Sequence, residues 1–160
     1  MKVPTELVRQ WDTGLLQNQV FWTAVAANVV AQTVKLLLDY ALNRRWDLRR
    51  VLDTGGMPST HSATVSALAI AVAFAEGWDS PLFAVAAIFA LVVMYDATGI
   101  RRHAGQQAEL LNQLVRELQH VFQKGFAPGP LKELLGHSYL EVLLGALIGV
   151  LVAWVSFRYF

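Results

Sequence analysis

"SPLFAVAAIFALVVMYDATG", residues 80–99, decides the fold class of this chain. It carries no charged residue before Asp96, Pro81 opens it and Gly99 closes it. Proline at the start and glycine just past the end are typical of a helix. A helix that crosses the hydrocarbon core of a bilayer needs about 20 mostly apolar residues. The stretch therefore predicts a transmembrane helix.

Three further apolar stretches predict additional crossings. Residues 20–42 are long enough, although polar side chains interrupt them at Asn28, Gln32, Lys35 and Asp39. The stretch 62–77 is shorter and rich in small side chains. The stretch 138–160 ends in aromatic residues of the kind found at membrane interfaces. Together the stretches predict an all-α integral membrane helical bundle with about four transmembrane helices.

The composition agrees with a membrane protein. Hydrophobic residues make up 55% of the chain and charged residues 16%, whereas a water-soluble domain carries about 25% charged residues. The length predicts a single membrane-embedded domain over residues 1–160, with a polar N-terminal segment at 1–18. A net charge of +1 gives no argument for nucleic acid, and the lack of cysteine excludes disulfides and thiolate metal sites.

The segment between the last two crossings has a different pattern. Over residues 105–124 apolar side chains recur at helical spacing, while charged residues such as Arg116 and Glu117 occupy other faces. This pattern predicts one amphipathic interfacial helix, which lies on or against the membrane instead of crossing it. The stretch "FAPGP", residues 126–130, ends that helix.

The distribution of lysine and arginine predicts the side that each loop faces. Four crossings place the 43–61 loop and the 100–137 segment on one side and both termini on the other. The first side carries nine lysine and arginine residues, and the second carries three, Lys2, Arg9 and Arg158. Because positive residues favour the cytoplasm, both long connections are expected to be cytoplasmic.

A glycine-rich turn precedes the second crossing and contains a histidine. "TGGMPSTHSA", residues 54–63, places His61 at the start of the apolar stretch. Gly55 and Gly56 allow the backbone to approach a phosphate closely, and the free N–H groups of a helix N-terminus bind anions. The expected helix caps are Ser59, Thr60 or Ser62. A plain turn with a capping serine and a histidine bound to a carbonyl explains the same residues.

The last crossing begins with a second histidine. In "LGHSYLEVLLGALIGV", residues 135–150, Glu141 follows His137 by four residues and so lies on the same helix face. A carboxylate in this position fixes the tautomer of an imidazole and strengthens it as a nucleophile or base. A histidine–glutamate pair that only caps the helix is the alternative. Gly145 and Gly149 form a small-residue face that suits close helix packing.

These two stretches together resemble a known superfamily. "PSTH", residues 58–61, resembles the Pro-Ser-Gly-His motif of the type 2 phosphatidic acid phosphatase and vanadium haloperoxidase superfamily. "HSYLEV", residues 137–142, resembles its His-x3-Asp-Val motif, with Glu141 in place of aspartate. Over roughly residues 20–155 the chain is most similar to the divergent short branch of that superfamily.

The resemblance implies roles for individual residues. His137 would attack phosphorus and form a phosphohistidine, Glu141 would orient it, and His61 would protonate the leaving oxygen. It also implies a phosphate cradle made of Lys35, Gly56, Ser59, Thr60, Arg101, Arg102 and Lys132. The superfamily mechanism needs no metal and no cofactor, and the apolar runs point to a lipid phosphate as substrate.

The chain departs from the superfamily pattern at two arginines. The first motif has arginine seven residues after its lysine, where this chain has Leu42. The third motif has arginine shortly before its histidine, where this chain has Leu131. We therefore expect Arg101 or Arg102 to hold the phosphate, with Lys132 as a substitute. Three further residues have weaker assignments: His103 is a rival nucleophile, Asp96 a partner for Arg101 or Arg102, and His120 a surface residue.

The expected function is that of a membrane phosphatase. It would hydrolyse a lipid phosphomonoester, such as phosphatidylglycerol phosphate or phosphatidic acid, at the cytoplasmic face. An isoprenyl diphosphate phosphatase is one alternative. A non-catalytic membrane module that binds lipid phosphate or a protein partner is another, because two motifs are altered. Small-residue helix faces would also suit a homo-oligomer.

Overall fold

The computed structural model describes residues 14–44, 56–118, 129–131 and 136–159, and for residues 100–102 it describes the backbone alone. The described part is helical and contains no strand. The elements, in chain order, are η1 (Leu15–Gln17), α2 (Gln19–Asn43), α3 (Thr60–Glu76), α4 (Pro81–Thr98), α5 (Ile100–Glu117) and α6 (Tyr139–Tyr159). The helices predicted at 20–42, 62–77, 80–99 and 138–160 are confirmed, each to within two residues.

Polar caps set the starts of three of these helices. Asn18, Ser59 and Ser80 are the N-caps of α2, α3 and α4, and each side chain accepts a hydrogen bond from the backbone N–H three residues on. A cap of this kind satisfies one of the N–H groups that a helix leaves unpaired at its start. At the other end of α3, Gly77 adopts φ +97°, which favours glycine and stops the helix.

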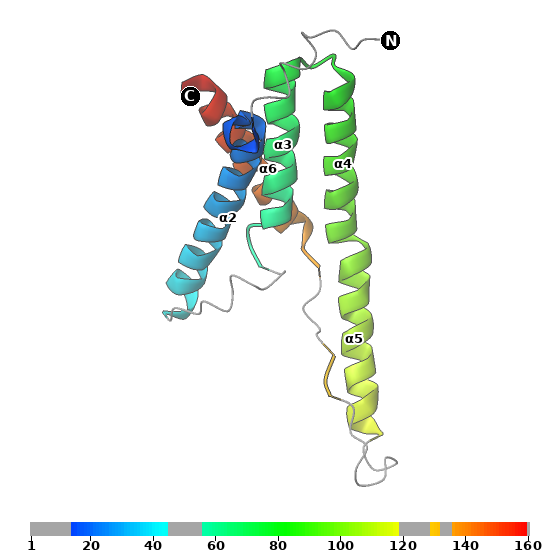
Figure 1. Cartoon of the computed structure of the whole chain (residues 1–160). Coiled ribbons are helices and arrows are strands. Elements are labelled where there is room, and N and C mark those ends of the chain that lie inside the picture. Colours follow the sequence, from blue (N-terminus) through cyan, green and yellow to red (C-terminus); the bar gives the residue numbers. More distant parts are fainter. Residues whose placement is uncertain (1–13, 45–55, 119–128, 132–135, 160) are drawn as a thin grey trace.

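Helix α3 is the centre of the bundle. It packs against α2, α4 and α6, and Figure 1 shows it between α4 on one side and the α2–α6 pair on the other. The approach of α6 to α3 depends on two glycines. A Cβ atom on Gly145 would collide with the carbonyl oxygen of Ser59, and one on Gly149 with that of Ala63. The small-residue face predicted on the last helix is therefore a packing surface.

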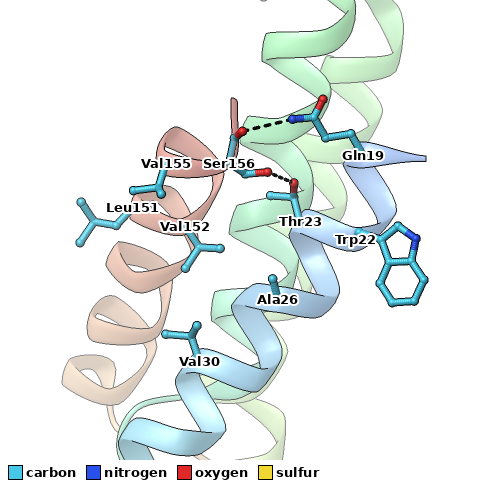
Figure 2. A pocket seen from close by; sticks show the side chains of 9 residues that line it. All are labelled: Gln19, Trp22, Thr23, Ala26, Val30, Leu151, Val152, Val155 and Ser156. Atoms are coloured by element: carbon cyan, nitrogen blue, oxygen red, sulfur yellow. Dashed lines mark hydrogen bonds between the residues drawn. The ribbon is translucent and has the colours of Figure 1, made fainter. Parts of the chain in front are cut away.

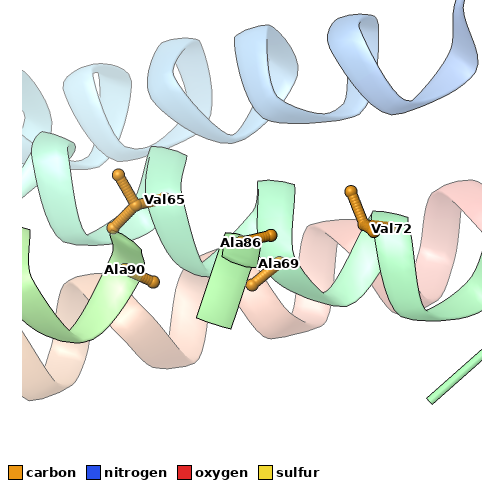
Figure 3. Packing of buried hydrophobic residues seen from close by; sticks show 5 residues of the cluster. All are labelled: Val65, Ala69, Val72, Ala86 and Ala90. Carbon is orange, nitrogen blue, oxygen red and sulfur yellow. The ribbon is translucent and has the colours of Figure 1, made fainter. Parts of the chain in front are cut away.

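Small side chains also fill the interface between α3 and α4. Val65, Ala69 and Val72 of α3 meet Ala86 and Ala90 of α4 (Figure 3). Alanine lets two helices approach until their backbones are nearly in contact, which is how helices associate in membranes. The described core therefore consists mainly of alanine and valine instead of large apolar residues.

The large apolar side chains lie on the outside. On α4, for example, Val85 is 67% exposed and Ile88 62% exposed. Three helical stretches are long and apolar enough to cross a membrane, Gln19–Asn43, Pro81–Glu117 and Tyr139–Tyr159, and Thr60–Glu76 is a shorter apolar helix. A surface so rich in exposed apolar residues is stable only against lipid. The chain is an integral membrane protein.

Helix α5 follows α4 almost without a break. Gly99 joins the two helices, and Figure 1 shows α5 running on from α4 beyond the end of α3. The Gly99 N–H binds the Tyr95 carbonyl at 2.9 Å, and the Gly99 carbonyl accepts from the His103 N–H at 3.0 Å. Because both hydrogen bonds persist across Gly99, the amphipathic helix begins at Ile100 and not at 105. The last residues of its predicted range, 119–124, lie outside the described part.

The two sides of α5 differ. Ala108 and Asn112 are buried, and the Asn112 side chain binds both the N–H and the carbonyl of Leu131, at 2.9 and 2.8 Å. Leu110 and Leu114 are exposed. The helix is amphipathic as the sequence predicts, and its position relative to a lipid surface stays a prediction.

Candidate active site

Two helix ends and one turn meet at one end of the bundle. The N–H of Ser59, in the turn before α3, donates to the Glu141 carbonyl in the first turn of α6 at 3.0 Å. The N–H of His137, just before α6, donates to the Ala97 carbonyl at the end of α4 at 2.9 Å. These two backbone bonds hold the PSTH turn, the end of α4 and the start of α6 together.

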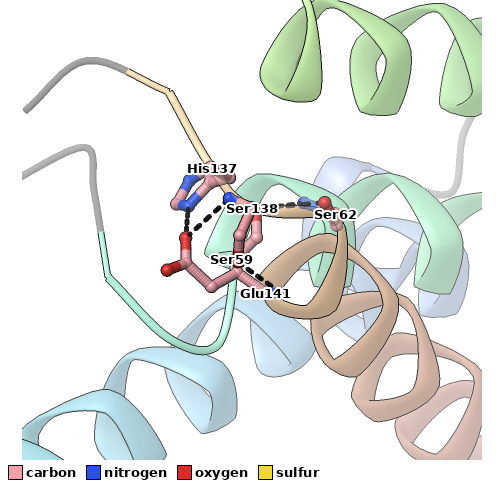
Figure 4. A network of polar contacts seen from close by, with 5 residues as sticks. All are labelled: Ser59, Ser62, His137, Ser138 and Glu141. Atoms are coloured by element: carbon pink, nitrogen blue, oxygen red, sulfur yellow. Dashed lines mark hydrogen bonds and ion pairs between the residues drawn. The ribbon is translucent and has the colours of Figure 1, made fainter. Parts of the chain in front are cut away.

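His137 is buried, and among the described residues one of its two ring nitrogens has a hydrogen-bond partner. Its exposed fraction is 4%, and its Nδ1 lies 2.8 Å from Glu141 Oε2 (Figure 4). Its Nε2 is also buried and makes no hydrogen bond within the described part of the chain. A buried polar atom without a partner is rare in folded proteins and calls for an explanation such as catalysis or a missing ligand.

A capping box holds Glu141 in place. The Ser138 hydroxyl accepts from the Glu141 N–H, and the Glu141 carboxylate accepts from the Ser138 N–H, each at 3.3 Å. In Figure 4 the Ser138 N–H and His137 Nδ1 both point at the same carboxylate oxygen. This reciprocal pair is the S-x-x-E arrangement that starts many helices. The S-x-x-E pattern is present in the sequence at 138–141, but the role predicted for Glu141 rests on the His–Glu spacing and the motif resemblance and does not use this pattern.

The geometry indicates which nitrogen of His137 carries the proton. A carboxylate accepts hydrogen bonds and donates none, so Nδ1 is the protonated nitrogen beside an ionised Glu141. In the neutral ring Nε2 then has its lone pair available. The arrangement therefore presents a fixed imidazole whose Nε2 has no partner in the part of the chain that the structure describes.

The serine turn is tightly tied to the bundle. Ser59 is fully buried, and its hydroxyl accepts from the N–H and the hydroxyl of Ser62 at 3.3 and 3.0 Å. Since its own N–H binds Glu141, Ser59 caps α3 and anchors α6. Thr60 begins α3 and is half-buried. The expected contacts of Ser59 and Thr60 with phosphate stay predictions.

Lys35 reaches this turn from α2. The side chain is buried, with 6% of the residue exposed. A Cβ atom at Gly56 would lie 3.0 Å from Lys35 Cε and 3.8 Å from Nζ. Gly56, at φ +97°, therefore leaves room for the lysine in addition to making the turn. The contact brings the predicted lysine of the cradle beside Gly56, 21 positions away in the chain and two residues before the PSTH turn.

The other predicted site residues lie around this end or outside the described residues. His61 is exposed in the first turn of α3, and Asp96 is half-buried near the end of α4. Arg101 and Arg102 are in the first turn of α5, a few residues beyond Ala97, with only their backbone described. Of the rest, Lys132 and His120 lie outside the described ranges, and His103 is exposed with its Nδ1 3.3 Å from Gln106 Oε1. Within the described ranges no three His, Asp or Glu side chains are grouped to hold a metal.

The fold and this end of the bundle define a helical membrane protein with a buried histidine–glutamate pair where the ends of its helices meet. A family model, the Divergent PAP2 family, matches residues 16–152, and the chain belongs to that family. The chain is also similar to the uncharacterized membrane protein YuiD of Bacillus subtilis strain 168. The two are 44% identical over 155 residues, which cover 91% of this chain and 98% of YuiD. No solved structure matches the chain.

Proposed function

We propose that the protein is a membrane phosphatase that removes the phosphate from a lipid phosphomonoester, such as phosphatidic acid or phosphatidylglycerol phosphate, through a phosphohistidine. The observation that carries this proposal is His137, whose Nδ1 is bound to Glu141 and whose buried Nε2 has no partner among the described residues. A nucleophile needs a free lone pair and a fixed direction of attack. His137 has both.

The proposed reaction has two steps. First, His137 Nε2 forms a bond to phosphorus while the bond from phosphorus to the lipid oxygen breaks, and that oxygen takes a proton from the His61 imidazolium. Water then attacks phosphorus and loses a proton to His61 while the bond from phosphorus to His137 Nε2 breaks, which releases inorganic phosphate. The products are the lipid alcohol and phosphate, and both histidines return to their starting states.

Positive charge at this end of the bundle supports phosphoryl transfer. Phosphoryl transfer depends mainly on positioning and on stabilisation of the charge on the equatorial oxygens. Lys35 lies beside Gly56 in the turn before α3, and Arg101 and Arg102 follow the end of α4. In the proposal these cations bind the phosphoryl oxygens, as the arginine and lysine residues of the superfamily would.

The membrane setting supports a lipid substrate. The bundle presents apolar side chains outward, and the candidate site is at one end of it, where the head groups of lipids would lie. An isoprenyl diphosphate would offer the same phosphoryl chemistry and remains the alternative substrate. A module that only binds lipid phosphate would show no turnover, which distinguishes it from both kinds of phosphatase.

Phosphate release by the purified protein in detergent tests the proposal. We expect turnover of phosphatidic acid or phosphatidylglycerol phosphate that survives EDTA and is competitively inhibited by vanadate. Vanadate adopts the five-coordinate geometry of the transition state, so its inhibition should require His137. If lipid phosphates bind without turnover, the protein is a binding module. If EDTA abolishes activity and a divalent ion restores it, the phosphohistidine mechanism is wrong.

A further inference from the structure

Asn28 is a polar side chain on the outer surface of a membrane-spanning helix. It lies near the middle of α2 and is exposed. Its Nδ2 donates to Thr64 Oγ1 at 2.9 Å, and that hydroxyl donates to the Thr60 carbonyl at 2.8 Å. Within the described part of the chain Asn28 makes no other hydrogen bond. Its amide oxygen and one amide hydrogen are available to an outside partner.

An amide with free hydrogen-bonding groups is costly in hydrocarbon. Water, which satisfies such groups on a soluble protein, is absent from the bilayer core. Polar residues inside spans therefore face the bundle interior or mark the path of a polar ligand. Asn28 borders α3, where it binds Thr64, but it remains exposed, so its unused amide groups point to a ligand with polar groups.

The position of Asn28 and Thr64 relative to the candidate site suggests which ligand. Thr64 lies one turn after His61 on α3, about 4.5 Å further into the bundle at the usual helical rise. Asn28 lies seven residues before Lys35 on α2, which places the two on the same helix face. The Asn28–Thr64 pair therefore lies further along the bundle than the candidate phosphate site, toward the membrane centre.

We infer that Asn28 and Thr64 form a subsite for the glycerol ester region of a glycerophospholipid substrate. In such a lipid the ester groups are a few covalent bonds from phosphorus, on the membrane side of it. Asn28 donates an amide hydrogen to an ester carbonyl, and Thr64 holds the amide in position. This inference rests on the proposed function and narrows it, because an isoprenyl phosphate has no ester to bind.

The surface also has an apolar cavity, but its lining gives no argument for a polar ligand comparable to the amide of Asn28. A cavity of about 540 Å³ lies between α2 and α6 at the end of the bundle away from His137 (Figure 2). Its polar side chains bind one another or the backbone: Thr23 and Ser156 share a hydrogen bond of 2.7 Å, and Gln19 donates to the Ser156 carbonyl at 3.2 Å. Its other lining residues are apolar, so they point to no particular ligand chemistry.

The test compares substrates with and without ester carbonyls. We expect Asn28→Leu to raise the KM for dioleoyl phosphatidic acid about 5-fold, the usual scale for one hydrogen bond, and to leave kcat nearly unchanged. The KM for the dialkyl ether analogue and for farnesyl phosphate should not change. Thr33→Val is the matched control: Thr33 is exposed on α2, but its hydroxyl bonds to the Val29 carbonyl of its own helix.

A binding measurement separates this inference from the proposed function. Native mass spectra of the full chain in detergent should show that the wild type retains dioleoyl phosphatidic acid better than its ether analogue, and that Asn28→Leu retains the two equally. If the wild type turns over no lipid but shows this preference, the subsite stands and the proposed function fails. If Asn28→Leu leaves the preference intact, the subsite is wrong. If it instead dissociates a dimer in the same spectra, Asn28 serves an interface between two copies and the subsite is again wrong.

Discussion

The starts of α3 and α6 each have a serine and a histidine close together, but the two histidines have opposite surroundings. His61 comes two residues after its cap, Ser59, and is exposed. His137 comes one residue before Ser138, is buried, and is bound by Glu141 and by the Ala97 carbonyl. A change of three positions relative to the cap thus separates an accessible imidazole from a fixed one. The proposed reaction needs one of each, for proton exchange and for attack.

The largest expected effect comes from the fixed histidine. His137→Ala should abolish phosphate release, because no other described group offers a free nitrogen in that position. Turnover of phosphatidic acid by the purified variant in detergent measures this. His103→Ala is the control and should keep activity near that of the wild type. Full activity in His137→Ala together with loss in His103→Ala would move the nucleophile to α5.

Removing the arginines beyond α4 tests whether the fixed histidine acts within a charged cradle. Arg101→Ala or Arg102→Ala should lower kcat on the order of 100-fold, the scale for losing one donor that stabilises transition-state charge. Arg44→Ala is the control and should have a mild effect, since it lies at the end of α2 as a left-handed C-cap. Equal, mild losses in all three variants would indicate a basic surface without a catalytic cradle.

Replacing the carboxylate that holds His137 sharpens the comparison further. Glu141→Gln keeps a side chain that suits a capping box, but it removes the charge that fixes the imidazole, so kcat should fall on the order of 10-fold. Ser138→Ala is the matched control. Loss of the cap should lower its free energy of unfolding by about 1 kcal/mol, with little effect on kcat. If both variants lose stability but keep the kcat of the wild type, Glu141 is only a helix cap.

The smallest expected effect is that of replacing the exposed His61 on the hydrolysis of a substrate with a good leaving group. His61→Ala should slow hydrolysis of phosphatidic acid strongly, but that of p-nitrophenyl phosphate only a few-fold. A good leaving group needs little protonation, so the loss of a general acid costs it little. The ratio of the two kcat values is the measurement. Equal losses on both substrates would give His61 a role other than proton donation.

Local sequence was enough to predict the helices and the His137–Glu141 pair. Long apolar runs and capping residues fix the helix bounds, and a four-residue spacing fixes the pair. The sequence places the start of α5 at residue 105, five residues after its observed start at Ile100. The reason is that Gly99 is expected to end the preceding helix, whereas helical hydrogen bonds continue across Gly99.

Contacts between distant segments could not be predicted in the same way. The packing of Lys35 against Gly56, and the bond from the His137 N–H to the Ala97 carbonyl, depend on how the helices pack around α3. A single sequence carries no local signal for either contact. The S-x-x-E capping box at 138–141 is different, since its pattern is local and visible in the sequence.

The near-continuous α4–α5 rod has a mechanical consequence. Gly99 is its joint, and the Ala97 carbonyl, two residues before that joint, holds the backbone of His137. A force applied to the far end of α5 acts through a lever about 27 Å long, the length of 18 residues at 1.5 Å each. Bending at the joint would shift the carbonyl that holds the histidine.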